Sequence, residues 1–269
     1  ADVLHLEVGQ PSTGAPGRVV EAAKAALGRE VLGYTDALGI PPLRQAIARH
    51  YRDRYGVEVD PARIVVTTGS SGAFILSFLA AFDQGARVAV TAPGYPAYRN
   101  ILSALGIEVV EIEVGPQTRF QPTPALLDRA GKLDGLIVAS PANPTGTMLT
   151  PQGLQSLVVD CEANKRWLIV DEIYHGITFG QTAETVLELT DRAIVINSFS
   201  KYFSMTGWRL GWMVVPHALM RSVESLAQNL FISPPAVSQA AAIGALAAQE
   251  ELDANVARYA RNRELLLNE

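Results

Sequence analysis

Short apolar runs that each lead into polar residues constrain the fold of this chain most strongly. They occupy residues 64–66, 87–90, 135–138, 167–170 and 193–196. Runs of this length are typical of buried strands rather than helices. Longer stretches with helical periodicity, such as 19–27 and 43–55, lie in the same chain. The alternation predicts an α/β fold with a mostly parallel sheet covered by helices on both faces.

The remaining elements follow the same pattern. We expect further strands over 108–112 and 210–215, and helices that begin near Ala73, Ile101, His217, Pro235 and Glu250. Pro41 and Pro42 precede the helix over 43–55, where prolines are tolerated. In open sheets of this kind, ligands bind at the carboxyl ends of the strands. The polar residues that follow each run are therefore the candidates for a site.

Composition limits the class of partner. The 269 residues are 48% hydrophobic and carry a net charge of −5, which favours a large core and argues against nucleic acid. Cys161 is the single cysteine, so no intrachain disulfide forms, and we expect a cytoplasmic protein. The four histidines show no metal-ligand spacing, and His175 is interpreted as a structural neighbour rather than a base. Residues 236–248 are too short to span a membrane.

Lys201 lies in the segment 197–209, among small hydroxyl residues and eight residues before Arg209. A lysine attacks an aldehyde only when its amine is partly desolvated or crowded by cations. Because Lys201 follows a buried strand, it is expected to emerge with little water around it. Arg209 and the Ser198 hydroxyl suit a phosphate group. The alternative interpretation is a solvated lysine at a strand end.

Asp171 and Tyr174 follow the apolar run 167–170. A carboxylate beside a pyridine nitrogen keeps that nitrogen protonated, and the ring then accepts electrons. The alternative is an aspartate that caps the next helix or pairs with an arginine. Upstream, the prolines and glycine of 139–146 predict a rigid turn that presents Asn143.

Two more loops complete the candidate site. Ser70 and Ser71 lie where a strand passes into a helix, so their hydroxyls and backbone N–H groups suit an anion. The loop has neither the dinucleotide fingerprint nor the Walker pattern, which disfavours a nucleotide. Tyr95 stands between prolines and could stack on a cofactor ring, or it packs on the sheet edge.

Together these motifs resemble the class I and II aminotransferases of fold type I, which use pyridoxal 5'-phosphate. The segments 198–201 and 207–212 carry the most specific part of the resemblance, and the motifs run in the family's order from Gly9 to Gly211. The resemblance implies that Lys201 forms an imine with the cofactor, Asp171 pairs with the pyridine nitrogen, and Tyr174 and Asn143 bond the phenolic oxygen. Tyr95 would stack on the ring. The implied phosphate contacts are Ser70, Ser71, Ser198, Arg209 and, from the other subunit of a homodimer, Tyr34.

The resemblance also implies the domain arrangement. Residues 1–20 would belong to a small domain, 21–248 would form the cofactor-binding large domain with a seven-stranded sheet, and 249–269 would begin a helix leading to the rest of the small domain. Most of that small domain, with the arginine for the substrate carboxylate, is expected beyond Glu269. Gly9 could offer its backbone N–H to the substrate.

The expected reaction moves an amino group between an L-amino acid and a 2-oxo acid, with 2-oxoglutarate as the default acceptor and ping-pong kinetics. The expected setting is amino-acid biosynthesis. Two alternatives stay open. One is a lyase or decarboxylase on the same scaffold, because fold does not determine reaction. The other is a non-catalytic module that binds the cofactor or an effector.

Overall fold

The computed structural model describes residues 9–268, which contain one mixed sheet of seven strands. The strand order is β1-β7-β6-β5-β4-β2-β3. The strands are β1 (Ile64–Thr67), β2 (Arg87–Ala92), β3 (Glu108–Glu113), β4 (Gly135–Ala139), β5 (Trp167–Asp171), β6 (Ile194–Ser198) and β7 (Gly211–Val214). The predicted α/β fold with a mostly parallel sheet is confirmed.

Only β7 among these strands runs against its neighbours. It pairs antiparallel with both β1 and β6, with Met213 opposite Ile196 in the β6 register. The other pairs, β2 with β3 and β4, β4 with β5, and β5 with β6, are parallel. The expectation that the segment from Arg209 provides the antiparallel strand is confirmed. The carboxyl ends of the six strands that share one direction therefore lie at one edge with the start of β7.

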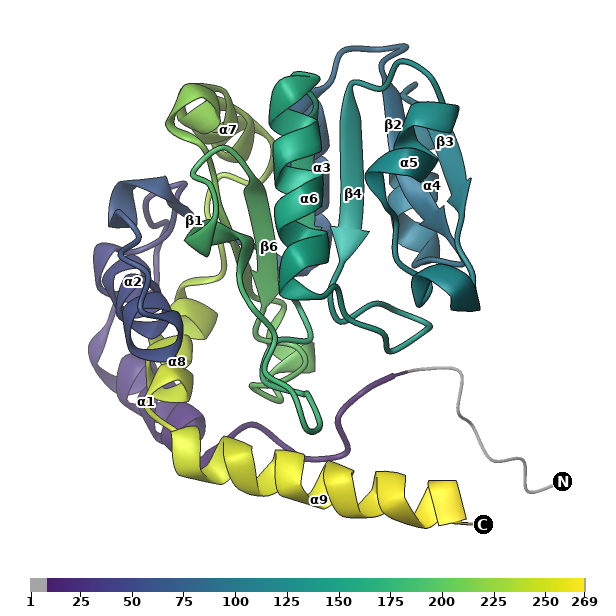
Figure 1. Cartoon of the computed structure of the whole chain (residues 1–269). Helices are drawn as coiled ribbons and strands as arrows, with labels where there is room; N and C mark the ends of the chain where they lie inside the picture. Colours follow the sequence, from purple (N-terminus) through teal and green to yellow (C-terminus); the bar gives the residue numbers. More distant parts are fainter. Residues whose placement is uncertain (1–8, 269) are drawn as a thin grey trace, which may run out of the picture.

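Helices cover both faces of the sheet (Figure 1). They are α1 (Gly17–Arg29), α2 (Pro41–Tyr55), α3 (Gly69–Ala81), α4 (Pro96–Ala104), α5 (Pro124–Arg129), α6 (Pro151–Ala163), α7 (His217–Leu230), α8 (Ala236–Leu246) and α9 (Gln249–Asn268). One apolar cluster joins the sheet to α3, α4 and α7, and the other joins it to α2, α5, α6 and α8. Because both faces are buried, the central strands are apolar at nearly every position.

Three helices differ from the sequence expectation. Helix α3 begins at Gly69, four residues before Ala73, so Ser70 and Ser71 lie in its first turn. Helices α5 and α6 were not predicted. Helix α6 begins with the Thr150 hydroxyl accepting a hydrogen bond from the Gly153 N–H, with proline at its first position. These are ordinary start signals, and the buried residues Leu154, Leu157, Val158 and Cys161 follow helical spacing.

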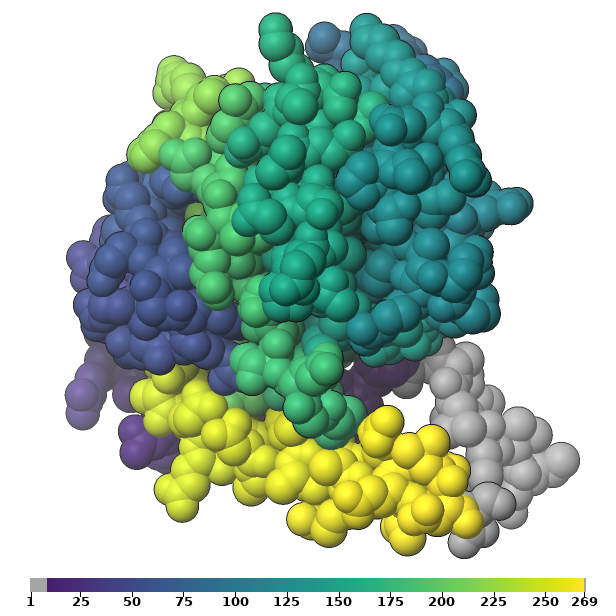
Figure 2. Space-filling model, viewed as in Figure 1, coloured from purple at the N-terminus to yellow at the C-terminus, as the bar shows by residue number. Residues whose placement is uncertain are grey.

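Helix α9 runs along the base of the molecule, next to the N-terminal segment (Figures 1 and 2). The Glu251 carboxylate accepts hydrogen bonds from the Gly17 N–H at 3.1 Å, and Arg258 donates to the Ser12 hydroxyl at 3.1 Å. The helix therefore holds the segment that enters α1. Within residues 9–268, no helix combines the length and apolarity needed to cross a membrane.

Candidate active site

A cavity of about 320 Å³ opens at the carboxyl edge of the sheet. Its lining comes from the ends of the strands and the loops that follow them. The lining residues are Gly9, Ser70, Ser71, Phe74, Tyr95, Tyr98, Asn143, Asp171, Ile173, Tyr174, Ser200, Lys201, Thr206 and Arg209. Nine of the eleven residues singled out in the sequence thus line one cavity, although they are spread over two hundred positions. The other two are Ser198 and Tyr34.

Lys201 lies in the turn that follows β6 and is half-buried. Its Nζ donates a hydrogen bond to the Gly9 carbonyl at 2.5 Å and lies 5.9 Å from the centre of the Tyr174 ring. Burial lowers the pKa of the Lys201 amine, Asp171 raises it and Arg209 lowers it further. Partial desolvation beside a cation is the setting in which a lysine becomes a nucleophile.

Asp171 is the last residue of β5 and is 3% exposed. Its carboxylate accepts hydrogen bonds from the Tyr98 hydroxyl and, at 3.0 Å, from the Ile173 N–H. Burial raises the pKa of Asp171 to about 6, while both hydrogen bonds and Lys201 oppose the shift.

Tyr98 was not predicted as a site residue. It lies one turn into α4, three residues after Tyr95, and this spacing is the signal that could have identified it.

Tyr174 and Asn143 come together from different loops. The Asn143 side chain favours the charged form of the phenol, although burial outweighs this effect and raises the pKa of Tyr174. Tyr95 is 39% exposed, and its ring meets Tyr98 edge to face with centroids 5.4 Å apart. One face of Tyr95 is thus supported by the protein, and its outer part is accessible to a ligand.

The first turn of α3 meets Arg209 at the far end of the cavity. Gly69 has φ +72°, and a Cβ at this position would lie 2.7 Å from Arg209 Nη2. Only glycine therefore lets the arginine approach the helix N-terminus so closely. Arg209 donates to the Thr206 carbonyl at 2.9 Å, and no carboxylate within residues 9–268 forms an ion pair with it.

Three predicted residues need separate description, and of these Ser198 lies in an unexpected setting. Ser198 is buried below the cavity, with Oγ 2.9 Å from the Ser200 Oγ and 3.1 Å from the Leu210 carbonyl oxygen. Ser200 and Thr206, which were not predicted, line the cavity in its place. Tyr34 is 84% exposed and does not line the cavity of its own chain. Gly9 presents its carbonyl oxygen, rather than its N–H, to Lys201.

The donor set suits pyridoxal phosphate. A desolvated amine, a buried carboxyl group, an accessible tyrosine ring and a phenol paired with an amide line one cavity. The helix N-terminus, the hydroxyls of Ser70 and Ser71, and the guanidinium of Arg209 form an anion cradle that glycine at position 69 leaves open. These groups are hydrogen-bond donors and a cation, and a phosphate would be their anionic partner.

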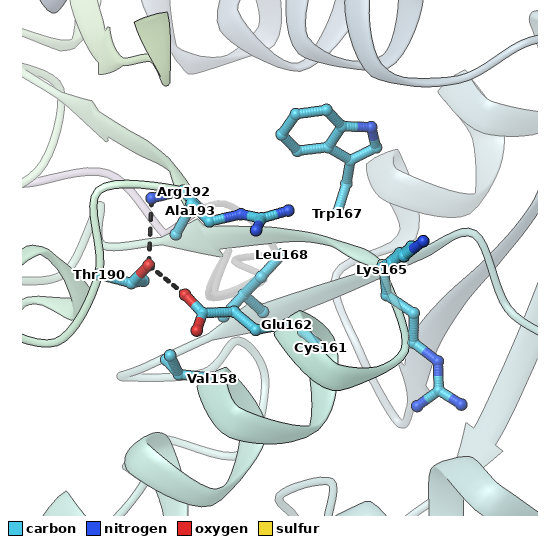
Figure 3. Close-up of a pocket in the computed structure, with 10 residues that line it drawn as sticks. Val158, Cys161, Glu162, Lys165, Trp167, Leu168, Thr190, Arg192 and Ala193 are labelled. Carbon is cyan, nitrogen blue, oxygen red and sulfur yellow. Dashed lines mark hydrogen bonds between the residues drawn. The ribbon is translucent and has the colours of Figure 1, made fainter. Parts of the chain in front are cut away.

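A second hollow, of about 120 Å³, lies at the opposite edge of the sheet between α6 and the starts of β5 and β6 (Figure 3). Val158, Leu168 and Ala193 line its apolar part. Across its mouth, the Thr190 hydroxyl donates to Glu162 at 2.6 Å. Cys161 is buried there, and burial raises the pKa of its thiol to about 12, so the thiol is unreactive at neutral pH. None of the predicted site residues lines this second hollow.

Comparisons with known proteins agree with the geometry. The family model for aminotransferases of class I and II matches residues 1–269. The valine–pyruvate aminotransferase of Mycobacterium tuberculosis is 54% identical over 272 residues, covering 99% of this chain and 70% of that protein. The aspartate/prephenate aminotransferase of Thermus thermophilus is 33% identical, covering 99% and 71%. The crystal structure of an aminotransferase from Mycobacterium tuberculosis superposes with a TM-score of 0.97 at 54% identity, covering 99% and 74%.

The match extends over the whole described fold, including the strands and loops that build the cavity. At these identities a shared family is shown, and the sheet with its single antiparallel strand agrees with the fold type I structures. The chain therefore belongs to the class I and II aminotransferases, enzymes that depend on pyridoxal phosphate to transfer an amino group between an amino acid and a 2-oxo acid.

Proposed function

We propose that the cavity at the carboxyl edge is the aminotransferase site and that Lys201 is its central catalytic residue. The observation that carries this proposal is the placement of a half-buried Lys201 and a buried Asp171 in one cavity whose far end presents Arg209. Residues 21–248 would form the cofactor-binding domain. All cavity-lining residues except Gly9 fall within these bounds, which supports the division.

Each residue has a separate task in this proposal. The Asp171 carboxylate would accept a hydrogen bond from the protonated ring nitrogen, and the Tyr174 hydroxyl and the Asn143 amide would donate to the phenolic oxygen. Ser70, Ser71 and Arg209 hold the phosphate, while Ser198 braces the Ser200 hydroxyl from below. Tyr95 stacks on the ring, and Tyr98 keeps Asp171 in place through its hydroxyl.

When bound, pyridoxal phosphate supplies an aldehyde and an electron-accepting ring. Lys201 Nζ would hold the aldehyde carbon until the amine of the substrate displaces it, and the freed Nζ would then take the proton from the substrate α-carbon. The Lys201 amine must be neutral when it removes the α-proton, because only a neutral amine can accept a proton. Burial and Arg209 both favour the neutral amine, whereas Asp171 favours the charged one.

For the substrates, we propose valine or a similar aliphatic amino acid as donor and pyruvate as acceptor. The support is the 54% identity to a protein named for that pair. The other relatives named above act on aspartate and prephenate at lower identity, and 2-oxoglutarate remains the competing acceptor. We also propose a cytoplasmic enzyme of amino-acid biosynthesis.

The test is a half reaction followed spectroscopically. Purified protein loaded with pyridoxal phosphate is mixed with valine, alanine, aspartate or phenylalanine, and the visible absorbance is expected to shift to the pyridoxamine form fastest with valine. Pyruvate should restore the original spectrum faster than 2-oxoglutarate. A lyase would release product without forming pyridoxamine phosphate, and a passive binder would leave the spectrum unchanged. A faster reaction with aspartate would overturn the proposed donor.

A homodimer with shared sites is the proposed assembly. Tyr34 is accessible and lies outside the cavity of its own chain, as expected of a residue that serves a partner. Complementation tests the idea. Tyr34→Ala and Lys201→Ala chains are each expected to be inactive or weak, and their mixture should regain activity, because one site of each mixed dimer then holds both native residues. Equal activity in the mixed and separate samples contradicts the shared site.

A further inference from the structure

A buried polar group lies behind the cavity wall and takes no part in the roles proposed above. Glu172 follows Asp171 directly, and because strand side chains alternate, it points to the opposite side of β5. It is 0% exposed. Its Oε1 accepts hydrogen bonds from the Thr185 hydroxyl at 2.9 Å and the Val186 N–H at 3.0 Å. Its Oε2 is the one buried side-chain polar atom of residues 9–268 without a hydrogen-bond partner.

The nearest polar neighbour of that oxygen is His175. Glu172 Oε2 lies 3.6 Å from His175 Nδ1, which is too far for a hydrogen bond. His175 Nε2 lies 3.0 Å from the Ser140 carbonyl oxygen, and Nδ1 lies 2.9 Å from the Tyr55 hydroxyl. A carbonyl oxygen can only accept, so Nε2 carries a hydrogen, and in a neutral ring Nδ1 accepts from Tyr55. Every hydrogen-bonding atom of the neutral imidazole is thereby used.

The protonation states follow from the cost of burying charge. An unpaired neutral hydroxyl in the interior costs about 1–3 kcal/mol, and an unpaired charge costs more. Burial raises the pKa of Glu172 to about 8 and lowers the pKa of His175 to about 3. The groups that face the pair are Asp171, Glu188, Tyr51, Tyr55, Arg54 and His50. Two of these are acids that disfavour a charged Glu172, and Arg54 and His50 disfavour a charged His175.

This pair lies between both loops that face the cofactor. His175 directly follows Tyr174, and its N–H donates to the Glu172 carbonyl at 2.9 Å. Ser140 opens the loop that carries Asn143, and its N–H donates to the Asp171 carbonyl at 3.2 Å. The bond from His175 Nε2 to the Ser140 carbonyl therefore ties the turn of Asp171 and Tyr174 to the loop of Asn143.

We propose that Glu172 and His175 are positioning residues of the aminotransferase site: the neutral imidazole holds the Ser140 carbonyl, and uncharged Glu172 keeps the imidazole neutral. A charged Glu172 would favour protonation of His175 Nδ1. Nδ1 would then donate a hydrogen bond to the Tyr55 hydroxyl instead of accepting one from it. The inference rests on the roles proposed for Asn143 and Tyr174. It assigns a task to two residues that touch neither cofactor nor substrate.

The matched pair His175→Gln and His175→Asn tests the histidine. Glutamine can place an N–H near the Nε2 position and so retain the bond to Ser140, whereas asparagine reaches only the Nδ1 position. For protein loaded with pyridoxal phosphate, His175→Asn is expected to raise the pH midpoint of the visible absorbance and to lower kcat by about tenfold, since one hydrogen bond contributes about 1 kcal/mol or more. The kcat of His175→Gln should stay within about threefold of the wild-type kcat, because the hydrogen bond to Ser140 is retained. Equal effects of the two variants overturn the proposal.

Glu172→Gln tests the acid in the protein without cofactor, so its outcome does not depend on the proposed reaction. The folded protein keeps a proton that the unfolded chain releases above the ordinary pKa of 4.5. Stability from the protonated group is thus complete below that pH and is lost as the pH rises to about 8. Glutamine mimics the protonated acid, so Glu172→Gln is expected to flatten this fall in Tm. Loss of stability at all pH values would show a charged Glu172 and overturn the inference.

Discussion

The two ends of the sheet treat charge in opposite ways. At the carboxyl edge, Lys201 and Arg209 form no ion pair within the described residues, and the buried Asp171 is held by neutral donors. At the amino edge, two arginines are paired within the protein: Arg166 with Asp160, whose side chains are 6% and 10% exposed, and Arg87 with Glu108.

This difference separates ligand binding from stability. Paired charges at the amino edge neutralise each other and need no ligand. In the proposed function, the charges at the carboxyl edge are left to contact pyridoxal phosphate. The same strands carry both ends, so variants at either edge can test whether function and stability separate as this comparison requires.

The largest effect is expected from Lys201→Ala. Loss of the amine removes both the covalent attachment of the cofactor and the proton carrier, so transamination should fall by at least about 10³-fold. The visible absorbance of the attached cofactor should disappear. The control is Lys165→Ala at the amino edge, which should leave the spectrum and kcat unchanged. An unaltered spectrum in Lys201→Ala would place the aldehyde on another lysine.

Asp171→Asn is expected to lower kcat by roughly 10²–10³-fold, because the electrostatic partner of the ring nitrogen is lost.

Without cofactor the same variant should be more stable than wild type above pH 6. Burial raises the pKa of Asp171 from 3.8 to about 6, so its contribution to stability is lost as the pH rises across that window, and asparagine avoids the loss. The facing groups are Tyr98, Tyr174, Glu172 and Lys201. Thermal unfolding at pH 5 and pH 8 measures the effect, and a variant equally destabilised at both contradicts it.

Arg209→Ala should weaken pyridoxal phosphate binding by about 10- to 100-fold, since a hydrogen bond to a charged group contributes about 1.5–3 kcal/mol. Binding of pyridoxal, which has no phosphate, should change little. Fluorescence titration of both ligands separates these outcomes, with Arg192→Ala at the amino edge as the control. An equal loss for both ligands would show that Arg209 does not contact the phosphate.

The smallest effect on activity is expected at the amino edge. Arg166→Met leaves Asp160 with only the Asn164 amide at 3.0 Å, so the free energy of unfolding should fall by roughly 2–3 kcal/mol. Substrate turnover should stay within twofold of wild type, because the cavity is untouched. Urea unfolding and steady-state kinetics measure the two quantities. A marked loss of kcat without loss of stability would break the separation between the two edges.

Much of the fold and site was predictable because it depends on local patterns. Each apolar run became a strand, and Asp171 and Lys201 emerged near the ends of β5 and β6, as the parallel sheet requires. Helix α6 was missed although Thr150 and Pro151 mark its start and its buried residues follow helical spacing. Tyr98 was missed because its contact with Asp171 spans 73 positions and depends on how α4 docks on the sheet.

The sequence by itself determined the order of strands and helices, the edge at which polar residues gather, and the family to which the motifs belong. Only the tertiary structure decided that Ser200 lines the cavity while Ser198 lies below it, and that Tyr98 holds Asp171. It also decided that Glu172 and His175 are both buried, which raises the pKa of Glu172 and lowers the pKa of His175. The reason is that periodicity is a property of neighbouring residues, whereas desolvation and hydrogen bonding depend on segments that meet only when the chain folds.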